Sequence, residues 1–272
     1  MSNTPDQEPT RGEPLVVPRV KATAVERSFG SGSDTVHALG PIDFDIADGE
    51  FACIVGPSGC GKSTFLRAVA GLIRPSAGEI AIQHTDSSRV PLAMVFQDYG
   101  IFPWKTVEAN VRFGLQVSGV RKAEAKLRSK EWIRRMGLID FADRYPAALS
   151  GGMRQRVAIA RAMALEPELL LMDEPFAALD AQRRELLQDE LLQICQADRR
   201  TVLFVTHSLE EALILGDRVV VMSARPGRIL RSVDVPFERP RSTELRSTAE
   251  FAALKGELWD LLRGEVTVGG AA

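Results

Sequence analysis

"GPSGCGKST" at residues 56–64 is the most informative stretch of the sequence, because an apolar run, "FACIV" at 51–55, precedes it and a helix-type pattern follows it. Residues 56–63 fit the pattern G-x-x-x-x-G-K-[ST], which requires a strand before it and a helix after it. Its glycines let backbone N–H groups turn inward around phosphate oxygens, and the start of the helix adds a partial positive charge. The stretch therefore predicts a phosphate-binding loop.

In such a loop Lys62 reaches the β- and γ-phosphates of a nucleotide, and the Ser63 hydroxyl ligates Mg²⁺. The alternative is an ordinary glycine turn with an exposed lysine, and the flanking strand and helix disfavour it. We expect nucleotide contacts from the whole loop, which consists of Gly56, Pro57, Ser58, Gly59, Cys60, Gly61, Lys62, Ser63 and Thr64.

Outside this loop, short apolar runs alternate with helix-type patterns. The strand-like runs lie at 20–29, 42–46, 51–55, 92–96, 169–173, 201–205 and 218–222. The helix-type patterns lie at 62–72, 153–165, 181–197, 208–215 and 242–263. Several strand-like runs are continuously apolar, as in strands covered on both faces, so the alternation predicts an α/β core with a mostly parallel sheet.

The chain reads as one domain at 19–263, with a helical subdomain at about 98–152 inserted into the α/β core, because strand-like runs stop there. The polar segment 1–18 is expected to be a disordered tail, neither signal peptide nor membrane anchor, and 264–272 a C-terminal tail. The net charge of −2 shows no basic bias that would suggest nucleic acid as a partner. The three cysteines show no metal-type spacing, and no stretch approaches the roughly 20 apolar residues of a membrane span.

Two carboxylates end an apolar strand in "LLLMDEP" at 169–175. Successive strand side chains alternate in direction, so Asp173 and Glu174 are expected to act differently. Asp173 suits Mg²⁺, and Glu174 suits polarisation of an attacking water. The alternative is a pair of carboxylates that only caps a strand end.

Gln97 and His207 also follow apolar strands directly. A lone glutamine there is more often solvated, and a lone histidine more often structural. In open α/β sheets, however, ligands gather beyond the carboxyl ends of the strands. Lys62 and Asp173 occupy equivalent places, so the four side chains are expected at one site.

A second candidate for anion binding is "LSGGMRQR" at 149–156. Ser150 offers a hydroxyl, Gly151 and Gly152 offer bare N–H groups, and a helix expected from Met153 presents its positive end. A plain capping turn would look the same in isolation. One nucleotide needs one phosphate loop, so this stretch raises the question of what else it binds.

Taken together, "GPSGCGKST", Gln97, "LSGGMRQR", "LLLMDEP", "ALD" at 178–180 and His207 resemble, in order and spacing, the ATPase subunit of an ATP-binding cassette (ABC) transporter, over about residues 20–263. The resemblance implies a phosphate-loop NTPase (RecA-like) core with an N-terminal antiparallel β subdomain. It implies ATP and Mg²⁺ as cofactors and a head-to-tail dimer, a homodimer here. The γ-phosphate bound by one subunit would then be gripped in trans by the other subunit's signature residues, Ser150, Gly151, Gly152 and Met153.

The same resemblance implies a role for each remaining motif. Phe29 would stack on adenine, although an ordinary core or edge phenylalanine fits the pattern too. Asp180 would link the two sites of the dimer, His207 would contact the γ-phosphate, and Gln97 would contact Mg²⁺ and the attacking water. The implied catalytic residues are Glu174, His207 and Gln97, and the implied Mg²⁺ ligands are Ser63, Gln97 and Asp173.

Two segments, "FQDYGIFPWKTVEANVRFGL" at 96–115 and "SARPGRI" at 223–229, resemble the corresponding segments of cassettes for nitrate, sulfonate or taurine import. This implies permease subunits, an indirect solute-binding protein, and a peripheral place on the cytoplasmic face of the inner membrane. The aromatic loop after Gln97 would receive the permease, or it simply covers a satellite core. A soluble ABC ATPase acting in cofactor assembly or repair stays open, whereas a small-molecule kinase would leave "LSGGMRQR" unexplained.

Overall fold

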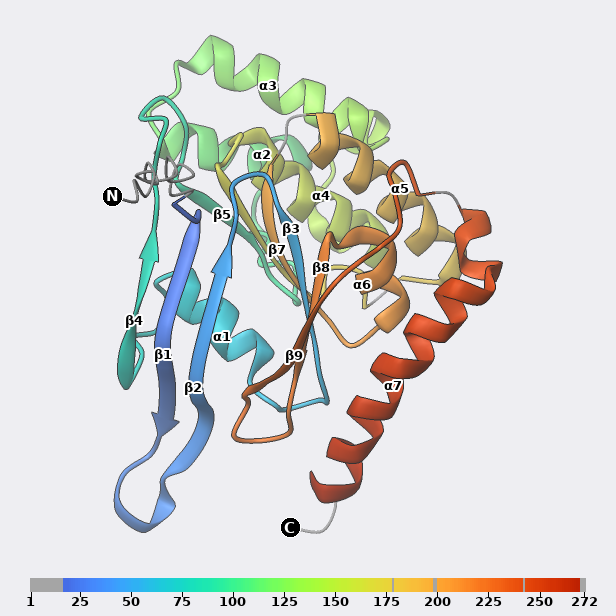
Figure 1. Cartoon of the computed structure of the whole chain (residues 1–272). Helices are drawn as coiled ribbons and strands as arrows, with labels where there is room; N and C mark the ends of the chain where they lie inside the picture. The colour runs from blue at the N-terminus through green and yellow to red at the C-terminus, as the bar shows by residue number, and fades with distance from the viewer. Residues whose placement is uncertain (1–16, 178, 198–199, 242, 270–272) are drawn as a thin grey trace, which may run out of the picture.

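Two β-sheets enclose the first helix of the chain (Figure 1). The computed structural model describes residues 17–177, 179–197, 200–241 and 243–269. Of the tail expected at 1–18, all but the last two residues lie outside this description. The sheets, and the helices on either side of the larger one, confirm the predicted α/β class.

The smaller sheet is antiparallel and has the strand order β2-β1-β4. Its strands are β1 (Val20–Phe29), β2 (Val36–Ile46) and β4 (Ala77–Ile82). β1 and β2 form a hairpin around a short 3₁₀ turn, η1 (Gly32–Asp34), which pairs Phe29 with Val36. This sheet is the antiparallel N-terminal subdomain that the family resemblance implied.

The larger sheet has the order β5-β6-β7-β3-β8-β9 and is parallel except for β9. Its strands are β5 (Leu92–Val95), β6 (Leu169–Asp173), β7 (Thr201–Thr206), β3 (Phe51–Val55), β8 (Arg218–Met222) and β9 (Ile229–Asp234). Every residue of β3, β6 and β7 is buried, which explains their unbroken apolar sequences. β4 and β9 were not predicted, because both are edge strands with largely exposed, mixed sequences.

Helices cover both faces of the larger sheet. They are α1 (Lys62–Val69), α2 (Val107–Val117), α3 (Lys122–Arg135), α4 (Gly151–Ala164), α5 (Ala181–Ala197), α6 (Leu209–Leu215) and α7 (Ala249–Gly269). Short 3₁₀ turns lie at η2 (Ile139–Phe141), η3 (Pro146–Ala148) and η4 (Thr243–Ser247). α1 packs between the two sheets, where Phe65 and Leu66 are fully buried, and the other helices form the second core cluster on the opposite face.

Four helix ends differ by more than one residue from the sequence prediction. α1 stops at Val69 rather than near 72. α4 begins at Gly151 rather than Met153, because Ser150 is its N-cap and both glycines lie in the first turn. α7 begins at Ala249 rather than near 242, and the 3₁₀ turn η4 occupies Thr243–Ser247. α7 continues to Gly269, so the C-terminal tail expected at 264–272 is helical up to that residue.

The helical insertion lies between β5 and β6 and shares its core with the sheet. Apolar side chains of α2 and α3, among them Val111 and Trp132, belong to the same buried cluster as Val95 and Met172 of the strands. α4 contacts α2, α3 and β5, so it joins the insertion to the sheet. The boundary expected near 152 therefore falls inside a helix that belongs to both parts.

A buried carboxylate, Glu168, ties three distant segments together just before β6. It accepts hydrogen bonds from Arg19 Nη1 (2.9 Å), Thr85 Oγ1 (2.8 Å) and Asp86 N (2.7 Å), and its Oε2 lies 2.7 Å from His84 Nδ1. Burial raises the pKa of Glu168, but the hydrogen bonds from His84, Thr85 and Asp86 outweigh it and lower this pKa to about 2. The charged Glu168 thus fastens the start of β1 and the β4–β5 connection to the larger sheet.

Candidate active site

The carboxyl ends of four parallel strands meet at one edge of the larger sheet. The phosphate loop follows β3, Gln97 lies in the turn after β5, Glu174 follows β6, and His207 follows β7. Since these strands run in the same direction, the sheet brings together residues that are up to 151 positions apart, from Gly56 to His207.

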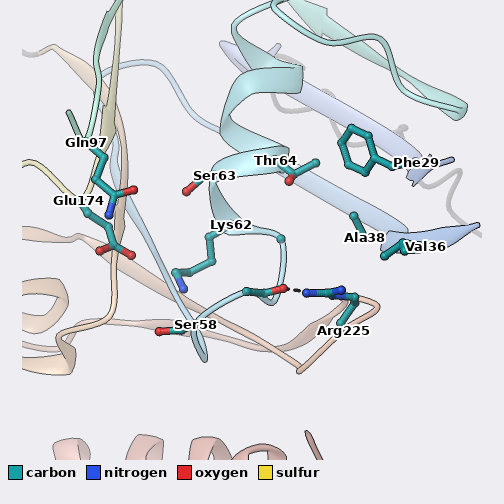
Figure 2. A pocket seen from close by; sticks show the side chains of 12 residues that line it. Phe29, Val36, Ala38, Ser58, Lys62, Ser63, Thr64, Gln97, Glu174 and Arg225 are labelled. Atoms are coloured by element: carbon teal, nitrogen blue, oxygen red, sulfur yellow. Dashed lines mark hydrogen bonds between the residues drawn. The ribbon is translucent and has the colours of Figure 1, made fainter. Parts of the chain in front are cut away.

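A pocket of about 430 Å³ opens at this edge (Figure 2). Figure 2 shows Gln97 and Glu174 on one side of Lys62, and Phe29, Val36 and Ala38 on the other. The residues that line the pocket are Phe29, Val36, Ala38, Ser58, Gly59, Gly61, Lys62, Ser63, Thr64, Gln97, Glu174 and Arg225. The structure therefore places most of the predicted nucleotide-binding residues around one cavity.

The glycines of the phosphate loop are required by its backbone and its close neighbours. Gly59 and Gly61 have φ values of +75° and +110°, which side chains disfavour. A Cβ atom on Gly61 would lie 2.8 Å from the Ala38 carbonyl oxygen of β2, and one on Gly56 would lie 3.0 Å from that of Met222. The loop is thus held between β2 and the end of β8.

Lys62 is buried and its ammonium group is fixed inside the loop. Its Nζ donates hydrogen bonds to the carbonyl oxygens of Gly56 and Pro57, both at 2.9 Å. Gly56, Pro57 and Cys60 are not among the residues that line the pocket. Cys60 is buried, burial raises its thiol pKa, and its contribution is to the packing of the loop.

Ser63 and Asp173 form a pair at the start of α1 and the end of β6. Ser63 Oγ donates a hydrogen bond to Asp173 Oδ1 at 2.7 Å. Asp173 is fully buried, and its Oδ2 has no hydrogen-bond partner among the described residues, with Arg67 3.7 Å away. Burial raises the pKa of Asp173, partly offset by Ser63 and Arg67. A hydroxyl and an under-satisfied carboxylate beside a phosphate loop fit Mg²⁺, which usually takes one or two carboxylates and substrate phosphates.

Glu174 and His207 form the second polar pair. His207 Nδ1 lies 3.1 Å from Glu174 Oε2, and the Glu174 side chain is largely sheltered whereas that of His207 is exposed. Glu174 has a φ of 44°, an uncommon value for a non-glycine residue that is often found at functional sites. This backbone turns Glu174 away from the strand that buries Asp173, so the two carboxylates occupy the different environments that the sequence predicted.

Phe29 lies at the far end of the pocket, at the last position of β1. The residue is 40% exposed, so it is not a core phenylalanine. The Arg27 guanidinium lies 4.4 Å from the ring centroid and covers part of it. An accessible aromatic face at this end of the pocket is suited to stacking on a planar base.

The signature residues Ser150–Met153 are not among those lining the pocket. Ser150 is exposed and caps α4, its Oγ accepting a hydrogen bond from Met153 N at 3.3 Å. Gly151 and Gly152 contribute first-turn N–H groups that have no partner within the helix. Asp180 is likewise exposed, just before α5, and Ala178, two positions earlier in the "ALD" motif, lies outside the described residues.

Comparison with known proteins agrees with this arrangement. The family described as ABC transporter matches residues 39–177, which is half of the chain. The chain belongs to the ABC transporter family. It is accordingly an ATP-binding, ATP-hydrolysing cassette.

Individual relatives cover nearly the whole ABC cassette. A putative ATP-binding protein of Brucella abortus is 50% identical over 82% of this chain and 86% of its own length. A taurine import ATP-binding protein of Rhizobium johnstonii is 43% identical over 88% of this chain and 94% of its own length. A nitrate import ATP-binding protein of Synechocystis is 42% identical over 91% of this chain and 96% of its own length. A solved dimeric cassette in a post-hydrolysis state, bound to ADP and Pi, has a TM-score of 0.72 and 32% identity, covering 80% of this chain and 100% of that one.

A contact made by α4 also bears on the site. Arg161, in the last turns of α4, donates hydrogen bonds to the carbonyl oxygens of Gly100 (2.7 Å) and Tyr99 (3.2 Å). The helix that starts at the signature therefore also holds the turn that follows Gln97.

In the part of the chain that is described, no helix is long and apolar enough to cross a membrane.

Three lining residues were not predicted from the sequence: Val36, Ala38 and Arg225. Val36 could have been inferred from hairpin pairing with Phe29, and Ala38 lies two residues further along the same strand face. Arg225 belongs to "SARPGRI", which stood out in the sequence only as a subfamily resemblance. Its place beside the phosphate loop depends on tertiary packing across 166 positions.

Proposed function

We propose that this ABC ATPase is the ATP-hydrolysing subunit of a membrane importer for a small solute, in the class of taurine, nitrate or sulfonate. The observation that carries the proposal is the division of its motifs into two groups. The phosphate loop, Gln97 and Glu174 surround one pocket, whereas the signature residues stand apart from it at the start of α4, where Ser150 is exposed. The relatives named as taurine and nitrate import proteins support the import assignment.

ATP occupies the pocket with its base on Phe29 and its phosphates at the loop. Lys62 and the inward N–H groups of residues 58–64 offset the phosphate charge. Ser63, Asp173 and Gln97 would hold Mg²⁺, which would supply further charge neutralisation at the phosphates. The roomy mixed lining, with one aromatic face and one polar end, is consistent with this orientation.

Glu174 accepts a proton from the attacking water. Its carboxylate lines the pocket and is largely sheltered, so it is available as a base at the end where the γ-phosphate lies. His207 hydrogen-bonds Glu174 and thereby orients its carboxylate. In this proposal His207 also contacts the γ-phosphate. Gln97, at the carboxyl end of the neighbouring strand β5, orients the same water.

Closure requires a second subunit. In the proposed head-to-tail homodimer, Ser150–Met153 of one subunit cover the γ-phosphate held by the other subunit's phosphate loop, and Asp180 lies between the two sites. The capping geometry of Ser150 and the first-turn N–H groups suits an anion. ATP then stabilises the closed dimer and hydrolysis releases it.

Transport places the cassette on the cytoplasmic face of the inner membrane, bound to permease subunits that receive solute from a binding protein. The loop after Gln97 is the proposed contact with the permease. Trp104 in this loop has 70% of its surface exposed, and tryptophan is among the residues enriched at protein–protein interfaces. Its connection to Gln97 would couple nucleotide state to that contact.

Uptake in cells that lack the gene tests the proposal. Cells with the gene deleted should lose uptake of labelled taurine, nitrate or an alkanesulfonate, and the wild-type gene should restore it. The Glu174→Gln gene, expressed to the same level, should not. The matched control is Glu124→Gln, a surface carboxylate of α3 paired with Arg128, which should restore uptake fully.

The alternative, a soluble ABC ATPase acting in cofactor assembly or repair, predicts a different result. Uptake of all three solutes would be unchanged by the deletion, and the tagged protein would remain in the supernatant after membranes are sedimented. That combination would exclude an import role while leaving the ATPase assignment intact.

A further inference from the structure

The loop 223–228, "SARPGR", joins β8 to β9 and has a closed, well-bonded conformation. Ser223 N donates to the Arg228 carbonyl oxygen, and Arg228 N donates to Ser223 Oγ, both at 2.9 Å. Ala224 N donates to Glu265 Oε2 of α7, also at 2.9 Å. The loop is therefore held in one shape from its base and from the C-terminal helix.

This loop packs directly against the phosphate loop. A Cβ atom on Gly227 would lie 2.1 Å from the Cys60 carbonyl oxygen, so only glycine permits the contact. Gly227 also exchanges backbone hydrogen bonds with β2: its N–H donates to Ala38, and its carbonyl accepts from Gly40 N (3.0 and 3.1 Å). The position of residue 225 relative to the phosphate loop is thus determined by backbone contacts on two sides.

Arg225 is exposed and lines the same pocket as Lys62. Among the described residues its guanidinium makes a single long hydrogen bond, from Nε to the Gly59 carbonyl oxygen at 3.5 Å, which leaves both Nη groups available. Figure 2 shows Arg225 on the Phe29 side of Lys62, away from Gln97 and Glu174. Lys62 and Arg225 are the two cationic side chains among the lining residues.

We propose that Arg225 is a second phosphate-binding residue, which binds the α- and β-phosphates of the nucleotide through its Nη groups. ATP carries about four negative charges, and a guanidinium forms strong, charge-assisted hydrogen bonds with phosphate oxygens. Because Arg225 lies on the side away from Glu174, it holds the part of the nucleotide that ATP and ADP share. It sets nucleotide affinity and takes no part in hydrolysis. The proposal rests on nucleotide binding by the cassette and not on the proposed transport.

Calorimetric titration of the isolated protein with Mg-ATP and Mg-ADP tests it. For Arg225→Ala the Kd of both nucleotides should rise about three- to tenfold, the range for a partly exposed charged hydrogen bond. Arg225→Lys keeps the charge but loses the forked geometry, so its Kd values should lie between those of wild type and Arg225→Ala. The KM for ATP should rise in parallel, with kcat within a factor of two of wild type.

Arg228→Ala is the matched control, because it removes an exposed arginine from the same loop that does not line the pocket. It should leave both Kd values unchanged. Wild-type Kd values in Arg225→Ala, a loss confined to ATP, or an equal loss in Arg228→Ala would each overturn the proposal. A lowered Tm of the nucleotide-free Arg225→Ala protein would also overturn it, if partial unfolding then accounts for the loss of nucleotide affinity. Failure of the wild type to bind either nucleotide would instead contradict the binding site itself, whereas failed uptake in cells would leave the proposal untouched.

Discussion

Replacement of Glu168 by glutamine should destabilise the fold in a pH-dependent manner. Glu168 is buried, and its carboxylate accepts the hydrogen bonds that join the start of β1 and the β4–β5 connection to β6. Glutamine has nearly the same shape but no charge, and its NH₂ group would face donors such as Asp86 N. The substitution therefore removes the negative charge and one hydrogen-bond acceptor at nearly constant side-chain volume.

The size of the effect follows from the pKa of Glu168, which is about 2 in the folded protein against an ordinary value of 4.5. A difference of 2.5 units corresponds to about 3 kcal/mol of stability at neutral pH. A lowered pKa contributes stability above the unfolded value, and that contribution is lost as pH falls toward the folded value. The difference in unfolding free energy between wild type and Glu168→Gln should thus narrow from about 3 kcal/mol at pH 7 to roughly 1 kcal/mol at pH 3.

Urea denaturation followed by far-ultraviolet circular dichroism at pH 7, 5, 4 and 3 measures this gap. Glu124→Gln serves as the control, since Glu124 forms an exposed pair with Arg128 at 2.7 Å and should change stability by no more than about 0.5 kcal/mol. A gap below about 1 kcal/mol at pH 7, or one that stays constant down to pH 3, would refute the assigned role of the Glu168 charge.

Four further changes probe the site. Glu174→Gln should lower ATP hydrolysis by roughly 10²–10⁴-fold without loss of ATP affinity, so that size-exclusion chromatography with Mg-ATP shows a stable dimer; wild-type turnover would remove Glu174 from catalysis. Lys62→Ala should weaken binding of a fluorescent ATP analogue severely, and unchanged affinity would contradict the phosphate-loop assignment. Ser150→Arg should abolish hydrolysis but keep ATP binding to the monomer; loss of that binding would show that Ser150 acts in its own subunit. Gly227→Ala should weaken nucleotide binding and lower Tm, because its Cβ would collide with the Cys60 carbonyl oxygen, and wild-type Tm would show that the loops separate easily.

Local patterns were sufficient to predict the parts of the site that lie within single segments. The phosphate loop needs only its own glycines, Lys62 and the flanking strand and helix. Asp173 and Glu174 follow directly from an apolar strand, and strand alternation was enough to predict that their environments differ. The convergence of Gln97 and His207 on the same edge followed from the parallel sheet.

Features that depend on packing between distant segments were not visible in the sequence. Arg225 reaches the pocket because Gly227 contacts the phosphate loop and β2 at once, and no local pattern encodes that contact. β9 was missed because its solvent-facing side chains, such as Arg231, conceal the alternation of an edge strand. The end of α7 was placed too early, since its last turns carry no strong apolar periodicity.

α4 connects the signature residues at its start to the turn after Gln97, which Arg161 contacts near its end. About 16 Å of helix separates Ser150 from Arg161, so a tilt of about 10° at the Ser150 end carries Arg161 through roughly 3 Å. Arg161 grips the Tyr99–Gly100 turn, whose other flank is Gln97. In the proposed dimer this turn would be displaced by its own subunit's nucleotide through Gln97 and by the partner's nucleotide through a tilt of α4. A turn that moves fully only when both displacements occur would keep the permease from responding to a single bound ATP.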